Sequence, residues 1–425
     1  MSRIDRDRLV ALRREFHRHP EPAWREFWTT ARIVEELEAI GVDELYVGRD
    51  ALDGDSRMAV PEDAELADWL ERAREAGVDE DTLAAMDGGY TGCVAVVDCG
   101  PGPTVGLRVD IDGLPRAEST DDDHVPARAG FRSETGAMHA CGHDGHATIG
   151  LGVVEAIRDS EFSGTLKVFF QPAEEVIGGG KAMAASEHVD DVDYLYALHL
   201  GLDHPTGEVV AGIDGFLAVE HLDVDFHGAP GHAGAKPEEG RNAMQAMAAA
   251  VQNMYGISRH SDGATRVNAG VVEGGTASNI IPEEVRAQVE VRGETTELKD
   301  YMSDRVKDVV AGAARMHDCE FDVELGGQAP SATSDQALVD FVMDAADGTD
   351  GVTSIVERDA LGGSEDATFL MQSVQDRGGL ACYVGVGTDH PGGHHTATFD
   401  VDEDSLPVGV DVLVGAIERV AERRP

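Results

Sequence analysis

Two short, continuous apolar runs constrain the fold of this chain more than any other feature. One spans 164–171 and is broken by Pro172, and the other spans 193–200. Each is about as long as a strand and is apolar at successive positions, so both faces of the strand must be covered. Segments with the apolar spacing of helices alternate with these and similar strands. The sequence therefore predicts an α/β layer structure with a mostly parallel sheet.

The same alternation extends towards both ends of the chain. We expect helices at 5–19, 24–40, 147–157, 335–346, 364–376 and from 402 onward, and further strands at 92–98, 104–110 and 380–386. Residues 48–90 interrupt this pattern with an acidic and mainly helical insert, which carries few side chains suited to catalysis.

Between 215 and 327 the pattern is different. Strands are expected at 217–226, 266–272, 284–292 and 319–324, and helices at 241–257 and 296–316. This βαββαβ order is that of ferredoxin-like domains. Because 425 residues exceed what one hydrophobic core normally supports, we expect two domains. One consists of 1–214 together with 328–425, and the other is the inserted segment 215–327.

The chain is extremely acidic, with a formal net charge of -47 at pH 7. In molar salt the Debye length falls to about 3 Å, which screens the repulsion that such a charge produces in dilute buffer. We therefore expect the chain to work in a halophile's cytoplasm. A nucleic-acid-binding protein needs a basic surface, so the charge argues against that class of function.

Cysteine usage and hydropathy are consistent with the same compartment. The five cysteines are scattered and form no disulfide framework, as is typical of a reducing environment. The first residues are charged rather than apolar, and no run reaches the ~20 apolar residues of a membrane span. We expect a soluble, cytoplasmic protein.

A cluster of potential metal ligands lies between Met138 and His146. It contains three histidines, Cys141 and Asp144, separated mostly by Gly and Ala, which let the backbone turn tightly. Imidazole, thiolate and carboxylate together suit a divalent ion, zinc first. The spacing is not that of a structural zinc module, so further ligands must come from elsewhere. The alternative is a polar loop of histidines that bind no metal.

Three further positions follow predicted strands, where α/β proteins collect functional groups. Glu174 and Glu175 follow the strand at 164–171. Because adjacent carboxylates should point apart, one could bind metal while the other transfers protons; a helix N-terminus is the simpler alternative. His199 ends the strand at 193–200, as a ligand or as a buried core residue. The pair His394-His395 lies in a glycine-rich loop after the strand at 380–386.

Asp110 and Asp112 close the strand at 104–110. Carboxylates at these positions could orient a histidine ligand, although a turn that ends the strand explains them equally well.

These motifs resemble those of the aminoacylase/carboxypeptidase-G family of dinuclear metallopeptidases and amidohydrolases. The likeness runs almost end to end, through Arg13 to His17, Met138 to His146, Gln171 to Glu175, Gly231 to Ala233, Asn279 to Pro282, Gly363 to Ala367 and Gly393 to Asp400. The nine residues from Met138 are specific to the branch with indole-acetyl-amino-acid, hippurate and aminobenzoyl-glutamate hydrolases. The insert at 48–90 points to the aminobenzoyl-glutamate type within that branch.

The resemblance implies an α/β/α zinc-exopeptidase-like domain with an inserted dimerisation or lid domain. It also implies two divalent cations, Zn or Mn, held by Cys141, His143, Glu175, His199 and His395, with the Cys141 thiolate between them. His395 is preferred to His394 because it stands four residues before Phe399.

The remaining roles also come from the resemblance. Glu174 would be the general base and acid, and His232 would stabilise the oxyanion across a dimer interface. Asn279 and Arg292 would bind the substrate carboxylate. His232 has an alternative reading as a turn residue, and Arg292 as a solvent-facing residue at a strand end.

The function implied is hydrolysis of the amide bond of an N-acyl amino acid, such as aminobenzoyl-glutamate. Deacetylation of an N-acetyl amino acid, hydrolysis of hippurate or indole-acetyl-amino acids, and dipeptidase activity are alternatives. A further alternative is a non-catalytic metal-binding subunit. The resemblance implies a homodimer, or a heteromer with a related subunit.

Overall fold

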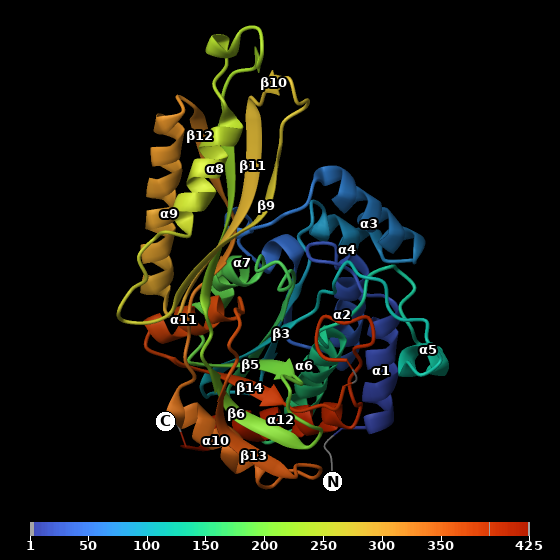
Figure 1. Cartoon of the computed structure of the whole chain (residues 1–425). Coiled ribbons are helices and arrows are strands. Elements are labelled where there is room, and N and C mark those ends of the chain that lie inside the picture. The colour runs from blue at the N-terminus through green and yellow to red at the C-terminus, as the bar shows by residue number, and fades with distance from the viewer. Residues whose placement is uncertain (1–3, 391, 424–425) are drawn as a thin grey trace. The chain divides into compact units, whose positions relative to one another are not determined.

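The computed structural model describes residues 4–390 and 392–423, which form two compact units (Figure 1). Unit 1 comprises the chain up to Gly215, Ala332–Leu361 and the chain from Asp366 onward. Unit 2 comprises Phe216–Ser331 and the short segment Gly362–Glu365.

Unit 1 is built on an eight-stranded sheet with the order β1-β2-β4-β3-β5-β14-β6-β13. The strands are β1 (Glu44–Val47), β2 (Cys93–Asp98), β3 (Thr104–Asp110), β4 (Thr165–Gln171), β5 (Tyr194–Leu200), β6 (Glu208–Asp214), β13 (Ser354–Ala360) and β14 (Leu380–Val386). β3, β4, β5 and β14 run parallel to their neighbours in this group, as do β6 and β13. β1 and β2, β2 and β4, and β6 and β14 are antiparallel. The sheet is therefore more mixed than the sequence predicts.

Helices cover both faces of this sheet. Those of unit 1 are α1 (Arg6–Arg18), α2 (Phe27–Ile40), α5 (Val125–Ala129), α6 (His143–Arg158), α7 (Gly180–Ala184), α10 (Gln336–Ala346), α11 (Thr368–Asp376) and α12 (Ser405–Arg423), besides the two in the insert. α6 packs against α1, α2 and α12, whereas α7 and α11 pack together against β4, β5 and β14. Successive residues of β4, such as Phe169 and Phe170, are both buried, as two covered faces require.

The insert at 48–90 belongs to unit 1 and carries α3 (Asp63–Glu75) and α4 (Glu80–Met86). It packs on α2 and on the segment that follows Glu175. The Trp24 indole donates to the Met58 carbonyl, and the Met58 amide donates to the Gly178 carbonyl. The insert thus supports the segment with the two adjacent glutamates.

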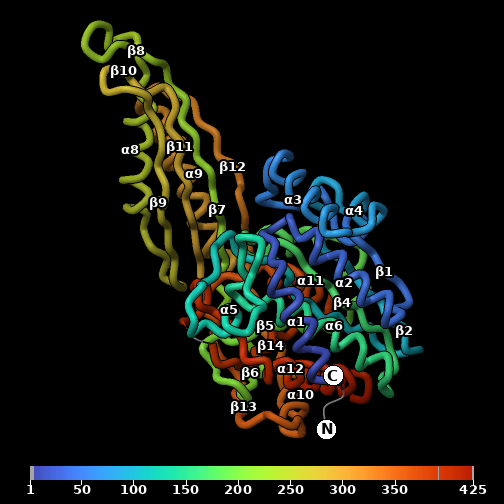
Figure 2. The backbone as a smooth tube through the Cα atoms, turned by 90° about the vertical axis from the view of Figure 1, so that its right-hand side faces the viewer, coloured from blue at the N-terminus to red at the C-terminus, as the bar shows by residue number. Residues whose placement is uncertain are grey.

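Unit 2 has the expected βαββαβ order around a four-stranded antiparallel sheet, β12-β7-β11-β9. Its main elements are β7 (Ala218–His227), α8 (Ala243–Met254), β9 (Thr265–Gly274), β11 (Glu284–Gly293), α9 (Thr296–Met316) and β12 (Glu320–Ala329). Figure 2 shows α8 and α9 running along the strands. Short strands β8 (Gly231–His232) and β10 (Ile280–Ile281) pair separately.

All five cysteines carry free thiols. Among the described residues, no helix combines the length and the apolar character that crossing a membrane requires.

Candidate metal centre

Four segments with candidate ligands meet at one edge of the unit 1 sheet. β3, β4, β5 and β14 run in the same direction, so their carboxyl ends share that edge. Asp110 ends β3, Glu174 and Glu175 follow β4, His199 is the penultimate residue of β5, and His394 and His395 follow β14. Cys141 and His143 lie where the loop after β3 leads into α6.

Two groups of three donor atoms share the sulfur of Cys141. The first group is completed by ring nitrogens of His143 and His199, and the second by Glu175 and His395. Within each group the three atoms lie within 4.8 Å of one another. The structure thus brings together the five ligands that the resemblance implies, in an arrangement that could hold two cations with the sulfur between them.

Hydrogen bonds fix the ring of His143 in the form that a metal ligand needs. Its Nδ1 lies 3.1 Å from a carboxylate oxygen of Asp112, so Nδ1 carries the proton and donates it. Nε2 is buried and makes no hydrogen bond within the described part of the chain. It lies 3.6 Å from Asp110 and 3.9 Å from Glu174. An imidazole nitrogen that faces two carboxylates in this way suits a position where a divalent cation could replace the ring proton.

Asp112 also holds a second candidate ligand. Its other carboxylate oxygen accepts a hydrogen bond of 3.0 Å from the Glu175 amide. One buried side chain therefore orients a candidate ligand from each of the two groups, as supporting carboxylates do in metal sites. Of the two readings of Asp112, the geometry favours the orienting one.

The His199 ring is oriented by its own strand. Nδ1 donates to the Leu200 carbonyl at 2.7 Å, which leaves the Nε2 lone pair 3.5 Å from the Cys141 sulfur. Burial and the nearby His146 and His394 keep the pKa of His199 well below its usual value. The ring is thus neutral, as a ligand must be.

The two histidines after β14 have different roles. Nε2 of His394 accepts a 3.1 Å hydrogen bond from the Leu202 amide, so its proton is on Nδ1, 3.5 Å from the Cys141 sulfur. His394 is therefore a donor to the sulfur. Nε2 of His395 lies 3.4 Å from a Glu175 oxygen, and its backbone, with a φ of 58°, is held in a left-handed turn. This geometry supports His395 as the ligand.

The other histidines of the cluster at 138–146 do not converge on the same point. Nε2 of His146 accepts a 2.8 Å hydrogen bond from the Leu200 amide, and its Nδ1 donates to Asp110. His139 donates from Nδ1 to the Asp112 carbonyl, and burial lowers its pKa to about 4. The density of histidines in the sequence is therefore greater than the number that lie around the Cys141 sulfur. His146 instead positions the end of β5, beside His199.

Glu174 and Glu175 lie in a turn, not at a helix N-terminus, because α7 begins only at Gly180. Both carboxylates come within reach of His143, contrary to the expectation that they point apart. The turn permits this because Ala173 has a φ of 57°, in the left-handed region that a non-glycine residue adopts at a cost of roughly 1–3 kcal/mol. The Ala173 amide donates to the buried Glu26 carboxylate at 2.8 Å, which holds the turn.

The electrostatics of the centre favour a bound cation. Burial and the charges of Glu175 and Glu174 raise the pKa of the Cys141 thiol. Burial alone would lower the pKa of His143, but Asp110 and Asp112 raise it well above the usual value. The site thus draws positive charge to the His143 nitrogen, and a divalent cation there would displace the proton and deprotonate the thiol.

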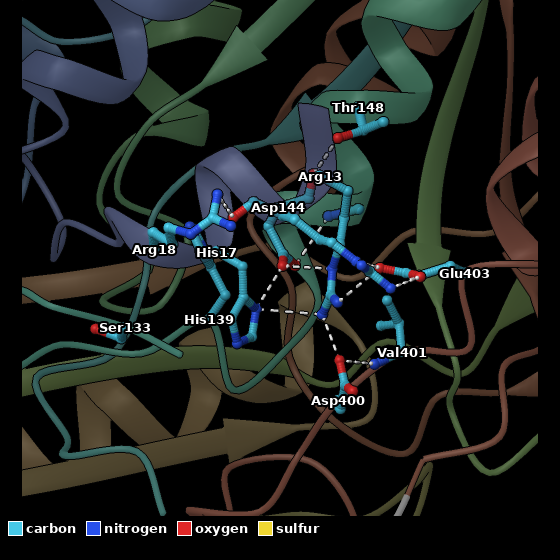
Figure 3. Close-up of polar contacts among 12 residues, drawn as sticks. Arg13, His17, Arg18, Ser133, His139, Asp144, Thr148, Asp400, Val401 and Glu403 are labelled. Carbon is cyan, nitrogen blue, oxygen red and sulfur yellow. Dashed lines mark hydrogen bonds and ion pairs between the residues drawn. The ribbon is translucent and has the colours of Figure 1, made fainter. Parts of the chain in front are cut away.

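A buried ionic network ties the N-terminal helix to the loop that carries Cys141 and His143. Arg13 of α1 has no exposed surface and lies 2.8 Å from Asp144 and 2.6 Å from Asp400. His17, one turn later, lies 2.7 Å from the same Asp144 oxygen (Figure 3). Asp144 follows His143 directly, and Asp400 lies five residues after His395. The network therefore fixes segments that carry candidate ligands of both groups.

Three of the predicted site residues, His232, Asn279 and Arg292, lie in unit 2. His232 is exposed in β8, and its Nδ1 accepts from the Gly234 and Ala235 amides, so Nε2 carries the proton and can donate. The Ala233 amide donates to the Asn279 carbonyl at 3.0 Å, which places those two neighbourhoods side by side. His232 thus serves as a turn residue, and its Nε2–H has no hydrogen-bond acceptor among the described residues.

Arg292 is already paired. Its Nε and Nη2 donate to the Glu290 carboxylate at 2.8 and 3.0 Å, and Nη1 lies 3.4 Å from Ser364. Binding a substrate carboxylate would require this ion pair to be shared or broken.

Comparison with known proteins identifies the family. The model of the peptidase family M20/M25/M40 matches residues 106–419. Indole-3-acetyl-aspartic acid hydrolase of Enterobacter agglomerans is 44% identical, over 95% of this chain and 94% of that protein. A p-aminobenzoyl-glutamate hydrolase subunit of Escherichia coli K12 is 42% identical, over 96% and 94%.

Solved structures agree with the sequence comparisons. The aminobenzoyl-glutamate utilization protein of Klebsiella pneumoniae is 38% identical, with a TM-score of 0.84 over 98% of this chain and 97% of that one. These matches confirm the resemblance and the fold class inferred from the sequence. The chain belongs to the peptidase family M20/M25/M40.

Proposed function

We propose that the chain hydrolyses the amide bond of N-acyl amino acids, with aminobenzoyl-glutamate as the type of substrate. The observation that carries the proposal is the pair of donor groups that share Cys141, with Glu174 beside them. The two relatives named above are hydrolases of an acyl-aspartate and an acyl-glutamate, which supports an acidic amino acid and an aromatic acyl group.

Two divalent cations, zinc or manganese, would be held by Cys141, His143, His199, Glu175 and His395. When bound, such cations polarise a carbonyl and lower the pKa of water towards about 7. Softness of the thiolate favours zinc, and the carboxylate is acceptable to both ions.

The protein's own groups would move the protons. Glu174 is mostly buried, with 12% of its side chain exposed, and lies beside His143. It would take a proton from the attacking water and deliver it to the departing amine. The Nε2–H of His232 would donate to the oxyanion of the tetrahedral intermediate, in the dimer that the resemblance implies.

The assembly we propose is a homodimer through unit 2, with a heteromer containing a related chain as the alternative. The Escherichia coli relative is named as a subunit of its hydrolase, which supports testing both. The proposed setting is a halophile's cytoplasm, on the strength of the net charge of -47.

The test uses the full chain loaded with Zn²⁺ or Mn²⁺ and a panel of aminobenzoyl-glutamate, hippurate, N-acetyl amino acids and dipeptides. The fastest turnover is expected with aminobenzoyl-glutamate. Glu174→Ala should reduce kcat by about 10²–10⁴-fold while two cations remain bound, whereas Cys141→Ala should lose metal.

A matched control is Glu161→Ala. This exposed glutamate precedes β4, so it lies at the opposite edge of the sheet from the centre. Its activity should equal that of the wild type. Near-full activity of Glu174→Ala at full metal occupancy would contradict the assignment, and faster turnover of an N-acetyl amino acid would replace the proposed substrate by that class.

A further inference from the structure

One arginine lies on a loop that is fastened to both ligand-bearing segments. Arg116 follows β3 by six residues, and its amide donates to the Leu114 carbonyl. Leu114 in turn exchanges two backbone hydrogen bonds with Met138, at the start of the metal-binding loop, at 2.8 and 3.0 Å. Ser119, three residues beyond Arg116, donates from its amide to the Ala397 carbonyl at 2.8 Å. Arg116 is therefore held between the Cys141 loop and the His395 loop.

The guanidinium of Arg116 is exposed and makes no hydrogen bond, ion pair or ring contact with any residue that the structure describes. Two other arginines close to the centre already form buried ion pairs. Arg13 pairs with Asp144 and Asp400, and Arg108 pairs with Asp110 and Asp366. In a chain with 81 acidic and 34 basic residues, an arginine without a carboxylate partner beside the candidate ligands is conspicuous.

The loop of Arg116 lies beside the solvent-facing part of the centre. The Ser119–Ala397 hydrogen bond fastens this loop two residues from His395. The His395 side chain is 59% exposed, so it lies at the solvent-facing side of the donor groups. Arg116 therefore adds positive charge at the side of the centre from which a ligand can enter.

An anionic ligand needs such a group on this protein. With a net charge of -47, the surface offers no long-range attraction to an anion. In molar salt, interactions beyond about 3 Å are screened, so attraction must come from direct contact. A guanidinium presents a planar fork of donors that matches a carboxylate in two-point contact.

We infer that Arg116 is a specificity-determining residue that receives the side-chain carboxylate of an acidic amino acid in the substrate, so that the substrate class is N-acyl glutamates and N-acyl aspartates. The inference rests on the proposed amidohydrolase function and deepens it. The α-carboxylate, which every N-acyl amino acid carries, is left to other groups.

The test compares aminobenzoyl-glutamate with its glutamine analogue, which has the same shape but a neutral side chain. The metal-loaded wild type, Arg116→Gln and Arg116→Lys are assayed with both compounds, and the ratio of kcat/KM for glutamate to that for glutamine is the readout. Losing one charge-assisted contact should lower this ratio by about 10- to 100-fold in Arg116→Gln. Arg116→Lys should lie between, because it keeps the charge but loses the fork.

Arg158→Gln is the charge-matched control. Arg158 ends α6, a helix of 16 residues that begins at His143, so its backbone lies roughly 22 Å from that of His143 along the helix axis. Its ion pair with Asp43 is exposed and 3.8 Å long. The control should leave the ratio unchanged.

The outcomes separate the two claims. A wild type that hydrolyses aminobenzoyl-glutamate while Arg116→Gln keeps the wild-type ratio would overturn the role of Arg116 alone. An equal fall with both compounds would also overturn it, because it would mean contact with a group that both share. A wild type, fully loaded with metal, that hydrolyses neither compound would refute the proposed function and this inference together.

Discussion

At the scale of single residues, the hydrogen bonds of each histidine decide its role. Nε2 of His143, His199 and His395 lies among the donor groups, whereas Nε2 of His146 and His394 accepts a backbone amide proton. The sequence shows which residues are histidines and how they are spaced. It does not show where each lone pair points, because the amides of Leu200 and Leu202 belong to another part of the chain.

Asp112 provides the sharpest residue-scale prediction. Its two oxygens accept from His143 and from the Glu175 amide, and Asn has only one acceptor oxygen. Asp112→Asn should therefore lose one of the two contacts and weaken metal binding by about 10- to 100-fold. Titration with a competing chelator measures the affinity. Asp121→Asn, in an exposed loop, controls for the loss of one charge, and equal affinities of the two variants would contradict the prediction.

At the scale of elements, most helices and strands were predictable from periodicity. α9 occupies the predicted range of 296–316, and β4, β5 and β14 lie within one residue of theirs. Three strands of the sheet were missed, namely β1, β6 and β13. β1 is four residues long and partly exposed, and β13 has the charged residues Glu357, Arg358 and Asp359 at the edge of the sheet. Short and charged edge strands lack the apolar pattern that prediction needs.

The boundary of α6 was also misplaced, with a consequence for the site. The helix was expected from 147 but begins at His143, after Gly142 with a φ of 87°. His143 and His146 are thus on the first turn of a helix, three residues apart. Hydrogen bonds to β3 and β5 set this geometry, so it cannot be predicted from the residues next to His143 and His146 in the sequence. The Glu174-Glu175 turn was missed for a similar reason, since its left-handed Ala173 is an unusual choice that only the fold enforces.

The network of Arg13 yields an element-scale prediction. Removal of this guanidinium leaves the Asp144 carboxylate buried with less compensation, so Arg13→Gln should reduce the free energy of unfolding by about 3–5 kcal/mol. Arg14→Gln is the matched control, because Arg14 is its neighbour on α1 but is 35% exposed in its ion pair with Glu403. The control should lose less than about 1 kcal/mol. Chemical unfolding at pH 7 measures both, and equal losses would contradict the network's importance.

The same network makes stability depend on pH in a defined direction. Burial alone would raise the pKa of Asp144, but Arg13 and His17 hold it well below its usual value. A carboxyl with a lowered folded-state pKa stabilises the fold above its unfolded pKa of about 3.9, and this contribution is lost as pH falls through the folded-state value. Arg13→Gln raises the folded-state pKa, so acid unfolding of that variant should begin at a higher pH than in the wild type.

At the scale of the whole molecule, charge is the dominant feature. The net charge of -47 should destabilise the compact state in dilute buffer and be screened in molar salt. The melting temperature should therefore rise steeply between about 0.1 and 3 M KCl, and turnover should follow it. Equimolar non-ionic osmolyte serves as the control, since it does not screen charge. Full activity and an unchanged melting temperature in dilute buffer would contradict the halophilic setting.

The whole-molecule organisation was partly readable from the sequence. Near residue 215, strands that are apolar on both faces give way to strands that alternate apolar and polar residues. This change marked the start of the insertion, and the structure divides the chain between Gly215 and Phe216. The return near 330 was harder to locate, because Gly362–Glu365 also belongs to unit 2. A segment of four residues is too short to show a periodic apolar pattern. Its place in unit 2 follows from the hydrogen bond that the Leu217 amide donates to the Gly363 carbonyl.

The central claim is that two cations share the thiolate of Cys141, and anomalous X-ray scattering from crystals grown with Zn²⁺ tests it most directly. We predict two anomalous peaks per chain, each about 2.3 Å from the Cys141 sulfur. One should lie between His143 and His199 and the other between Glu175 and His395, with His394 outside both coordination spheres. A single peak, or two peaks of which neither contacts Cys141, would contradict the account.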